Sequence, residues 1–461
     1  VRVENPTWNE RSSVYEYWTA LDAADYPDGP ITVSAVIEPD CPGHESRTLE
    51  DLTLFANSGG TLTNDKVAWV DCTSGNDRSG DGGESSPYAT IEKALVKVGS
   101  GGTVYLKAGL CYELTSLYPE AQFSHWTTVQ PAPGVTREQV QILADSDFSS
   151  TATGRFGQNL VRWKNVGIFS QSDANYSTVL SLDSGHLAWL DGAELYEKEG
   201  AAAKTDPWSG GKGHHVYLTN AHLHHLTNAG FTFGRGVLIS DIASDVFRAK
   251  SDILSVNLTV RDIDPGETEA HPDFFQLYDP DGTLENIVIY NTVVTNLDGQ
   301  GIFGGPGRLS DVAFVNLLME KDPADSPSTS QLSGSWDHVL LWHLTTVDSG
   351  FYLRKVDNLI NFYIQNGSFH SLHHGPETTL PGFTINHNRV ATLIWNQENG
   401  PMGSNATEGD PGYTDIANDN YRPASGSPLC GAGVPLPGVP ADAEGNLYHP
   451  EKPALGAFAC P

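Results

Sequence analysis

Three stretches decide the fold: ILSVN at residues 253–257, IVIYN at residues 287–291 and VAFVN at residues 312–316. In each, Asn follows four positions after the first apolar residue of a strand core. The same offset joins eight pairs along the chain: Val161 with Asn165, Val216 with Asn220, Val237 with Asp241, Ile253 with Asn257, Ile287 with Asn291, Val312 with Asn316, Val339 with His343, and Phe362 with Asn366. From Val216 onward the mean interval is about 24 residues, the length of one coil of a stacked β-solenoid.

Asn is poor inside a strand but suits the corner between two strands, because it tolerates a left-handed backbone and its amide can bond to the same amide one coil away. The alternative, in which each Asn ends an unrelated hairpin, does not account for the shared offset. The pattern therefore predicts parallel strands from about residue 161 to residue 369. It also predicts one corner that contains Asn220, Asn257, Asn291, Asn316 and Asn366.

The segment before this repeat begins with the strand VAWVDC (67–72) and a Gly- and Asp-rich loop. The helical pattern TIEKALVKV (90–98) and the strand GGTVYLKAGLC (101–111) follow. This order resembles the start of many bacterial proteins of the pectate-lyase-like superfamily. The resemblance implies an all-β, right-handed parallel β-helix with an amphipathic cap helix over its open first coil. The tail (409–461) resembles the closing segment of bacterial β-helix proteins and is expected to cover the last coil.

Residues 1–66 have a different pattern. The alternating stretches ITVSAVIEP (31–39) and LEDLTLFAN (49–57) lie between turn signals, which is typical of hairpins. We therefore expect a small β-sandwich-like accessory domain over residues 1–66, followed by the β-helix domain over residues 67–461.

The charge balance excludes several classes of partner. With 57 acidic and 26 basic residues the net charge is −31, and such a chain repels nucleic acids and anionic membranes. No apolar run approaches the roughly 20 residues of a membrane-spanning helix. An anionic sugar would need bound cations or a local basic patch.

The cysteines and the first residue favour export. Cys72 and Cys111 follow runs that can lie on neighbouring strands, and Cys430 and Cys460 can staple the tail, which leaves Cys41 without a partner. Disulfides belong to oxidising compartments, although buried free thiols are the alternative. The chain begins at Val1 with no charged-then-apolar leader, as expected if a targeting segment has been removed. We expect a secreted or cell-surface protein.

The third strands of successive coils suggest a binding face. Aligned on a small or acidic residue, they give one column of Arg235, Lys250, Tyr278, Pro306 and Lys355. Equivalent residues of a parallel stack lie above one another at about 4.8 Å, so this column would form a line of side chains. Three of its five members are basic, as an anionic sugar would require. Salt bridges to neighbouring acidic residues are the alternative.

Two short motifs lie beside this column. HPDFFQ (271–276) resembles a pattern of carbohydrate-active β-helix proteins, including mannuronan epimerase relatives, but departs from their Asp-Pro-His-Asp order. DVFRAKS (245–251) resembles a stretch of alginate and chondroitin lyases, whose Arg-His-Gly element is missing here. The lyase resemblance implies that Lys250 is the base. The candidate catalytic residues are Lys250, His271, Asp273 and Arg248, and the candidate substrate-binding residues are Gln276, Tyr278, Arg235, Lys355 and Asp245.

Two kinds of metal site are compatible with the sequence. Asp264, Asp279 and Asp281 offer the hard oxygen ligands that Ca²⁺ prefers, although no EF-hand pattern is present and a solvated acidic loop is the alternative. His222 and His224 are alternate residues of one strand and therefore share a face. No Cys accompanies them, and no compact ligand set is evident.

Three functions follow from these features. The first is a polysaccharide lyase, or a related epimerase, that acts on an acidic polysaccharide. The second is a glycoside hydrolase on the same scaffold, for which Asp245 and Asp273 on adjacent coils are the obvious carboxyl pair. The third is a non-catalytic surface, filament or sugar-binding protein, and self-assembly stays open because solenoids suit it equally.

Overall fold

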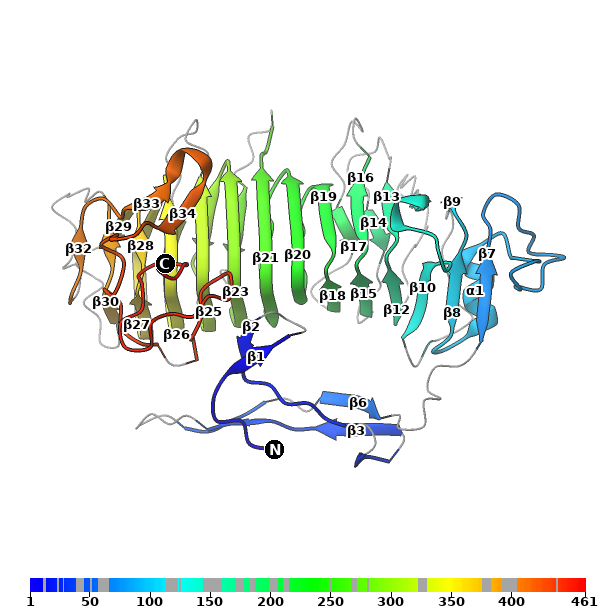
Figure 1. Ribbon diagram of the computed structural model, residues 1–461, viewed down its shortest axis with the longest axis horizontal. Helices are drawn as coiled ribbons and strands as arrows, with labels where there is room; N and C mark the ends of the chain where they lie inside the picture. Colours follow the sequence, from blue (N-terminus) through cyan, green and yellow to red (C-terminus); the bar gives the residue numbers. More distant parts are fainter. Residues whose placement is uncertain are drawn as a thin grey trace.

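Stacked coils of parallel strands form the body of the protein in the computed structural model (Figure 1). The structure describes residues 1–10, 14–22, 25–27, 29–38, 45–49, 52–56, 66–112, 123, 126–143, 160–170, 178–181, 187–198, 206–209, 215–248, 250–266, 272–279, 282–321, 330–374, 383–391, 404–436 and 438–461. Within these residues one sheet joins 24 strands, and successive coils pair in parallel. The predicted right-handed parallel β-helix is confirmed.

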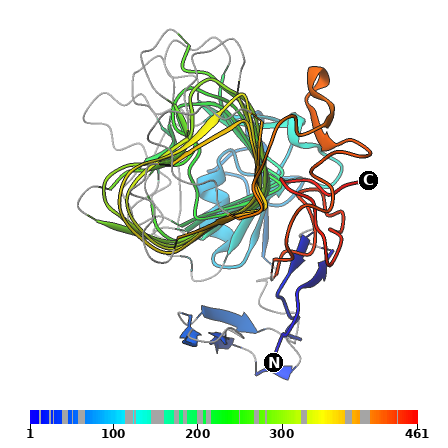
Figure 2. The same cartoon turned by 90° about the vertical axis from the view of Figure 1, so that its left-hand side faces the viewer.

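Viewed along the axis, the coils superimpose around a common interior (Figure 2). The first side contains β7 (Val67–Val70), β8 (Thr103–Leu106), β10 (Thr127–Pro131), β12 (Val161–Lys164), β15 (Leu187–Asp191), β18 (His215–Thr219) and β30 (Phe383–Asn386). The second side contains β9 (Gly109–Tyr112), β11 (Val140–Leu143), β13 (Gly167–Ser170), β16 (Glu194–Glu197), β19 (His222–Leu226), β28 (Ser368–Phe369), β31 (Arg389–Val390) and β32 (Thr407–Glu408).

Longer strands turn the corner between these two sides without a break: β20 (Phe233–Ile242), β21 (Ile253–Ile263), β23 (Thr283–Leu297), β25 (Arg308–Lys321) and β26 (Ser330–Val347). The third side contains β22 (Asp273–Leu277), β24 (Gln300–Gly304), β29 (Ser371–His374) and the first residues of β26 and β27 (Gly350–Gln365). A short pair, β14 (Thr178–Ser181) with β17 (Asp206–Ser209), completes the described parallel strands.

The predicted corner contains a ladder of amide hydrogen bonds. Asn291 Nδ2 donates to Asn257 Oδ1 at 3.2 Å, and Asn316 Nδ2 donates to Asn291 Oδ1 at 2.8 Å. His343 Nε2 and Asn366 Nδ2 continue the ladder at 3.1 Å. All five have positive φ values of 52–57°, the left-handed conformation that Asn tolerates best among residues with a side chain. The Asn corner is confirmed.

One pair of the series is assigned to the wrong strand. Gly236, not Asp241, occupies the corner between Asn220 and Asn257, and it has a φ of 62°. A Cβ at Gly236 would lie 2.6 Å from Asn220 Oδ1, so a residue with a side chain does not fit at this position. Asp241 lies one strand later, beside Asp262 at the second corner. The pairing of Val237 with Asp241 is therefore wrong, because the offset alone does not distinguish a first strand from a second.

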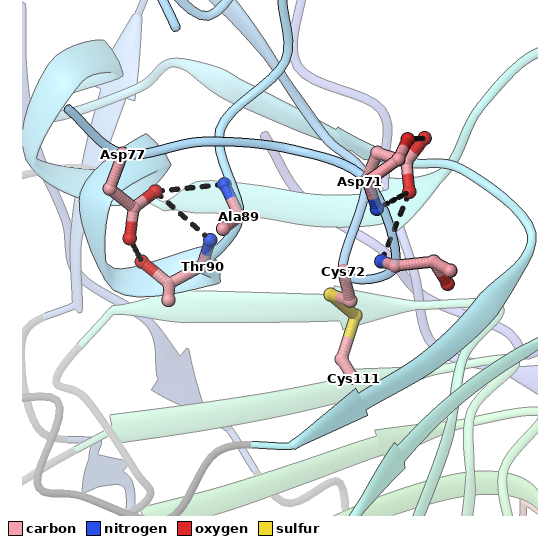
Figure 3. Close-up of a disulfide and its surroundings, with 8 residues drawn as sticks. Asp71, Cys72, Asp77, Ala89, Thr90 and Cys111 are labelled. Carbon is pink, nitrogen blue, oxygen red and sulfur yellow. Dashed lines mark hydrogen bonds between the residues drawn. A yellow bond between two sulfur atoms is a disulfide. The ribbon is translucent and has the colours of Figure 1, made fainter. Parts of the chain in front are cut away.

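The cap helix α1 (Ile91–Val98) covers the open first coil, as predicted. Thr90 caps its N-terminus by accepting a hydrogen bond from the backbone N–H of Lys93. Asp77 accepts hydrogen bonds from the backbone of Ala89 and from Thr90, which fixes the approach to the helix (Figure 3). Its apolar stripe, Ile91, Ala94, Leu95 and Val98, is buried in the core.

Both expected disulfides are present. Cys72 is joined to Cys111, which ties the first coil to β9 beside the cap (Figure 3). Cys430 is joined to Cys460, which closes the tail on itself. Cys41 lies outside the described residues. No helix among the described residues is long and apolar enough to cross a bilayer.

The C-terminal tail does not lie where the sequence suggested. Its described residues run along the Asn corner instead of across the last coil: Asn316 donates to the carbonyl of Ala441, and Asn366 donates to the carbonyl of Val434. Tyr448 donates to Asn316 Oδ1. The physical reason is that each ladder amide has hydrogen-bonding capacity left after it bonds along the ladder, and the extended tail uses it.

The N-terminal residues form antiparallel pairs: β1 (Thr7–Asn9) with β2 (Val14–Glu16), β3 (Gly29–Val33) with β6 (Leu52–Ala56), and β4 (Val36–Ile37) with β5 (Arg47–Thr48). The expectation of a small β module is confirmed. It contacts the β-helix where Arg47 pairs with Asp311 at 3.1 Å and where the Tyr290 hydroxyl donates to the carbonyl of Tyr15. The domain boundary at residue 66 stays a prediction.

Asn291→Ala should lower the free energy of unfolding by about 1–3 kcal/mol, because it removes the hydrogen bonds to Asn257 and to the fully buried amide of Asn316. The matched control is Asn296→Ala: Asn296 has the same φ of 54° but is exposed and bonds to Asp262, so we expect a loss of about 0.5 kcal/mol or less. Denaturant unfolding measures both. Equal losses of unfolding free energy in the two variants would mean that the hydrogen bonds of the Asn291 amide contribute no stability beyond the preference of Asn for a left-handed backbone.

Candidate functional site

The predicted site lies on the third side of the β-helix, where residues 245–248 run beside β22. Phe247 pairs in parallel with Phe275, and their rings stack inside the coil at 4.9 Å. Phe231 packs on Phe247 at the same separation. Because neighbouring side chains of a strand point to opposite sides, this interior ladder directs Arg248 and Gln276 outward.

The outward residues reach solvent. The side chain of Arg248 is 53% exposed and Tyr278 is 46% exposed. The Tyr278 ring lies over Gly305, where an added Cβ would come within 2.1 Å of the ring. The sequence alignment placed Pro306 beside Tyr278, and this assignment is wrong by one residue.

Two carboxyl groups lie under this surface. Asp245 Oδ2 accepts a hydrogen bond from Arg248 Nε at 3.1 Å, and Asp245 Oδ1 accepts one from the backbone N–H of Asp273 at 3.0 Å. Asp273 Oδ2 accepts from Gln276 Nε2 at 3.2 Å. Asp273 Oδ1 is buried and accepts no hydrogen bond from the described residues. The structure therefore brings Asp245, Arg248, Asp273 and Gln276 into one contiguous cluster.

Burial gives the two carboxyls unusual acidities. Burial, followed by the nearby charge of Asp245, raises the pKa of Asp273 to about 8. Burial also raises the pKa of Asp245, but the charge of Arg248 and the hydrogen bonds it receives oppose this rise. The two adjacent carboxyls therefore differ in environment: the pKa of Asp273 is raised to about 8, whereas Asp245 faces a guanidinium.

Lys250 contacts a neighbouring coil. Its Nζ donates to Thr232 Oγ1 at 2.8 Å. Burial lowers the pKa of Lys250, and the charge of Asp252 opposes this.

The other predicted residues divide into two groups. His271 lies outside the described residues, and only the backbone of Lys355 is described, within β27. Arg235 lies on the first side, next to the Gly236 corner, with its guanidinium 5.6 Å from the Phe233 ring centre. The prediction that Arg235 belongs to the same stripe as Lys250 is wrong. The connection after Asn220 is short, so the chain re-enters the first side as early as Phe233.

Candidate metal ligands are only partly described. Asp264 accepts a hydrogen bond from the backbone of Gly266, and Asp281 lies outside the described residues. Neither Asp264 nor Asp279 belongs to a three-ligand group among the residues that the structure describes, and calcium stays a prediction. The one such group in the described part of the chain is Glu194, His222 and His224. Reasoning from the sequence missed Glu194. In the structure, Glu194 pairs with His222 on the next coil.

Comparisons with known proteins give a weak likeness in fold. No family model and no curated protein matches the chain. It is similar to a GH136 lacto-N-biosidase from Eubacterium ramulus, with 10% identity over 74% of this chain and 66% of that one and a TM-score of 0.35. It is also similar to a rhamnogalacturonan lyase, with 11% identity over 78% and 94% of the two chains and a TM-score of 0.37.

A third solved structure is the catalytic domain of a GH87 alpha-1,3-glucanase in complex with nigerose. Its identity is 12% over 66% of this chain and 67% of that one, with a TM-score of 0.30. The chain thus spans just under two thirds of the lacto-N-biosidase, at 66% of its length. Likeness at these levels assigns no activity to the chain, and membership of the pectate-lyase-like superfamily stays a prediction.

Asp273→Asn should make the stability of the folded protein depend less on pH between about pH 4 and pH 8. The pKa of Asp273 is about 8 in the folded chain and 3.8 as its ordinary value, so the folded state binds the extra proton between these values. The stability of the wild type should therefore fall from about pH 4 to pH 8, by on the order of a few kcal/mol, and the neutral amide should remove this fall.

Thermal unfolding between pH 4 and pH 8 measures the effect. The exposed carboxyl variant Glu285→Gln should follow the wild-type profile. Parallel profiles for wild type and Asp273→Asn would show that Asp273 is ionised in the folded state throughout.

Proposed function

We propose that the protein is a carbohydrate-active enzyme that cleaves a polysaccharide on the third side of the β-helix. Asp273 donates the proton, and Asp245 is the ionised partner. The observation that carries this proposal is the adjacency of two buried carboxyls in different environments. Burial raises the pKa of Asp273 to about 8, and Asp245 is paired with Arg248. Carboxyl pairs whose environments separate their acidities are the usual acid and base of glycosidic cleavage.

The chemistry follows from these roles. The protonated Asp273 would transfer its proton to the glycosidic oxygen as the bond to the sugar breaks. The Asp245 carboxylate would stabilise the positive charge that develops on the sugar ring or attack it directly. A water molecule would then add to the same sugar carbon and return a proton to Asp273, which completes the hydrolysis. Adjacent coils are about 4.8 Å apart, which favours the short carboxyl separation of retaining enzymes, about 5–5.5 Å.

The surface beside the pair supports a polymer as the substrate. Strand register aligns Gln276, Phe303, Gln331 and Tyr352 along the helix axis. Amides can bond to sugar hydroxyls, and aromatic rings offer apolar faces for sugar rings. A line of such groups along a solenoid suits an extended chain.

The electrostatics favour a glycan of low charge. Arg235 lies on a different side of the solenoid, so the predicted basic stripe loses one of its three basic members. Arg248, which lies outside that stripe, already faces Asp245. The net charge of −31 further opposes a polyanion.

A polysaccharide lyase or epimerase is the second candidate, and Lys250 favours it. Burial lowers the pKa of Lys250, which increases the neutral fraction that can remove a proton next to a uronate carboxylate. The resemblance of DVFRAKS to lyases implies the same role. Lyase products carry an unsaturated uronate that absorbs in the ultraviolet, and hydrolysis products do not.

The setting we propose is extracellular. Disulfides such as Cys72–Cys111 and Cys430–Cys460 persist in oxidising compartments. A non-catalytic role at the cell surface, with or without self-assembly, remains the alternative to an enzyme, and turnover on a panel of polysaccharides decides between them.

Asp273→Asn should lower the rate of polysaccharide cleavage by about 10²–10⁴-fold, because it removes the proton donor and preserves the shape. Asp245→Asn should have a comparable effect, whereas Glu285→Gln should retain activity. Reducing-end release and ultraviolet absorbance of the products are measured together on neutral and uronate-containing polymers.

Lys250→Met separates the two candidates. A hydrolase should keep most of its rate in this variant, and a lyase should lose it together with the ultraviolet-absorbing product. Full activity in Asp273→Asn and Asp245→Asn would remove the carboxyl pair from the chemistry altogether.

A further inference from the structure

A second cluster of chemically active side chains lies on the second side of the β-helix. In the register of β16 and β19, Glu194 pairs with His222 and Tyr196 pairs with His224. Leu195 and Leu223, the residues between them, are fully buried in the core. The alternation of the strand therefore turns Glu194, His222 and His224 to the outer face together.

The ligand atoms of this cluster already lie close together. Glu194 Oε1 is 3.1 Å from His224 Nε2 and 3.7 Å from His222 Nδ1, and the ligand atoms of all three residues lie within 4.8 Å of one another. A tetrahedral zinc ion with bonds of about 2.0–2.1 Å separates its ligand atoms by about 3.3 Å. Only small shifts would bring the three atoms onto one ion.

The other ring nitrogen of each histidine has a partner of its own. His222 Nε2 lies 3.2 Å from Ser240 Oγ, and His224 Nδ1 lies 2.7 Å from His225 Nδ1. Histidines that bind metals usually donate this second N–H to a neighbouring group, which directs the lone pair of the first nitrogen at the ion. Here those first nitrogens are the two that face Glu194.

Packing holds the ring of His224 in place. It stacks on Tyr196 at 4.7 Å with an angle of 8°, and Tyr196 stacks on Phe169 at 5.4 Å. The Tyr196 hydroxyl donates to Gln141 Oε1 at 2.8 Å, which fixes the base of the stack. A preorganised ring loses little rotamer freedom when it binds an ion.

The charge of the cluster also suits a cation. A Glu194 carboxylate together with two neutral imidazole ligands would give the cluster one negative charge. Arg137 Nε lies 3.9 Å from the other oxygen, Oε2, and leaves Oε1 to the histidines. The three side chains are 15–23% exposed, so water can reach a further coordination position.

We propose that Glu194, His222 and His224 form a binding site for one divalent transition-metal ion of the zinc class. Two imidazoles and one carboxylate suit Zn²⁺, Co²⁺ or Ni²⁺ better than Ca²⁺, which prefers oxygen ligands alone. The site is separate from the Asp245 and Asp273 pair on the third side, and its occupancy is independent of the function proposed there.

The test uses the whole protein after treatment with a chelator. Titration with Zn²⁺ should show one tight site per chain, and Co²⁺ should give the visible absorbance of a low-symmetry, nitrogen-liganded ion. Loss of a hydrogen bond that supports a metal ligand lowers metal affinity by about 10–100-fold, and we expect a loss of this size in Ser240→Ala. The Zn²⁺ affinity should fall by more than this in each ligand variant: His222→Ala, His224→Ala and the shape-preserving Glu194→Gln.

The matched control is His370→Ala. His370 lies 3.6 Å from Asp348, but this pair belongs to no three-ligand group among the described residues. Its removal should leave the titration unchanged. Absence of a stoichiometric site in the wild type would overturn the proposal, as would unchanged Zn²⁺ affinity in Glu194→Gln and in either histidine variant that melts like the wild type.

Discussion

The structure depends on one interaction, the hydrogen bond between identical amides at the first corner of successive coils. Asn257, Asn291 and Asn316 each take the left-handed conformation that turns the chain, and each bonds to the next along the axis. A slip of one residue would move these amides out of line and reverse the side to which every neighbouring side chain points. The ladder thus fixes both the bend and the register, and the C-terminal tail uses the hydrogen-bonding capacity that remains.

That register carries the candidate chemistry. Stacked Phe247 and Phe275 fill the interior, which places Asp245 directly against the backbone of Asp273. Burying two carboxyls is costly in a protein interior, and the raised pKa of Asp273 is the measure of that cost. A fold built only for stability would place an apolar residue there. Retaining a buried acid at the edge of an open polar surface is what catalysis by proton transfer requires.

The two sites use the same scaffold in different ways. On the third side, burial beneath outward-pointing Arg248 and Gln276 changes the acidity of carboxyls. On the second side, alternate residues of β19 stay near the surface and meet a carboxylate from the previous coil. In both places the stacking distance of parallel strands brings together residues that are far apart in the sequence. A solenoid can therefore hold independent sites on its sides without disturbing its core.

Two local patterns in the sequence, an offset of four and a helical period, predicted the repeat, the Asn corner and the cap helix. Cysteines that follow short strand runs made two disulfides possible, and the structure shows which cysteines pair. The sequence also placed the segments around Arg248 and Gln276 on the third strands of neighbouring coils. It did not determine the lengths of the individual coils, so Asp241 and Arg235 were assigned to the wrong strands. The tertiary structure alone shows which residues of successive coils lie beside one another. That register brings Glu194 to His222 and the tail to the Asn corner. It also buries Asp273, which raises its pKa, since desolvation depends on neighbours that no local pattern specifies.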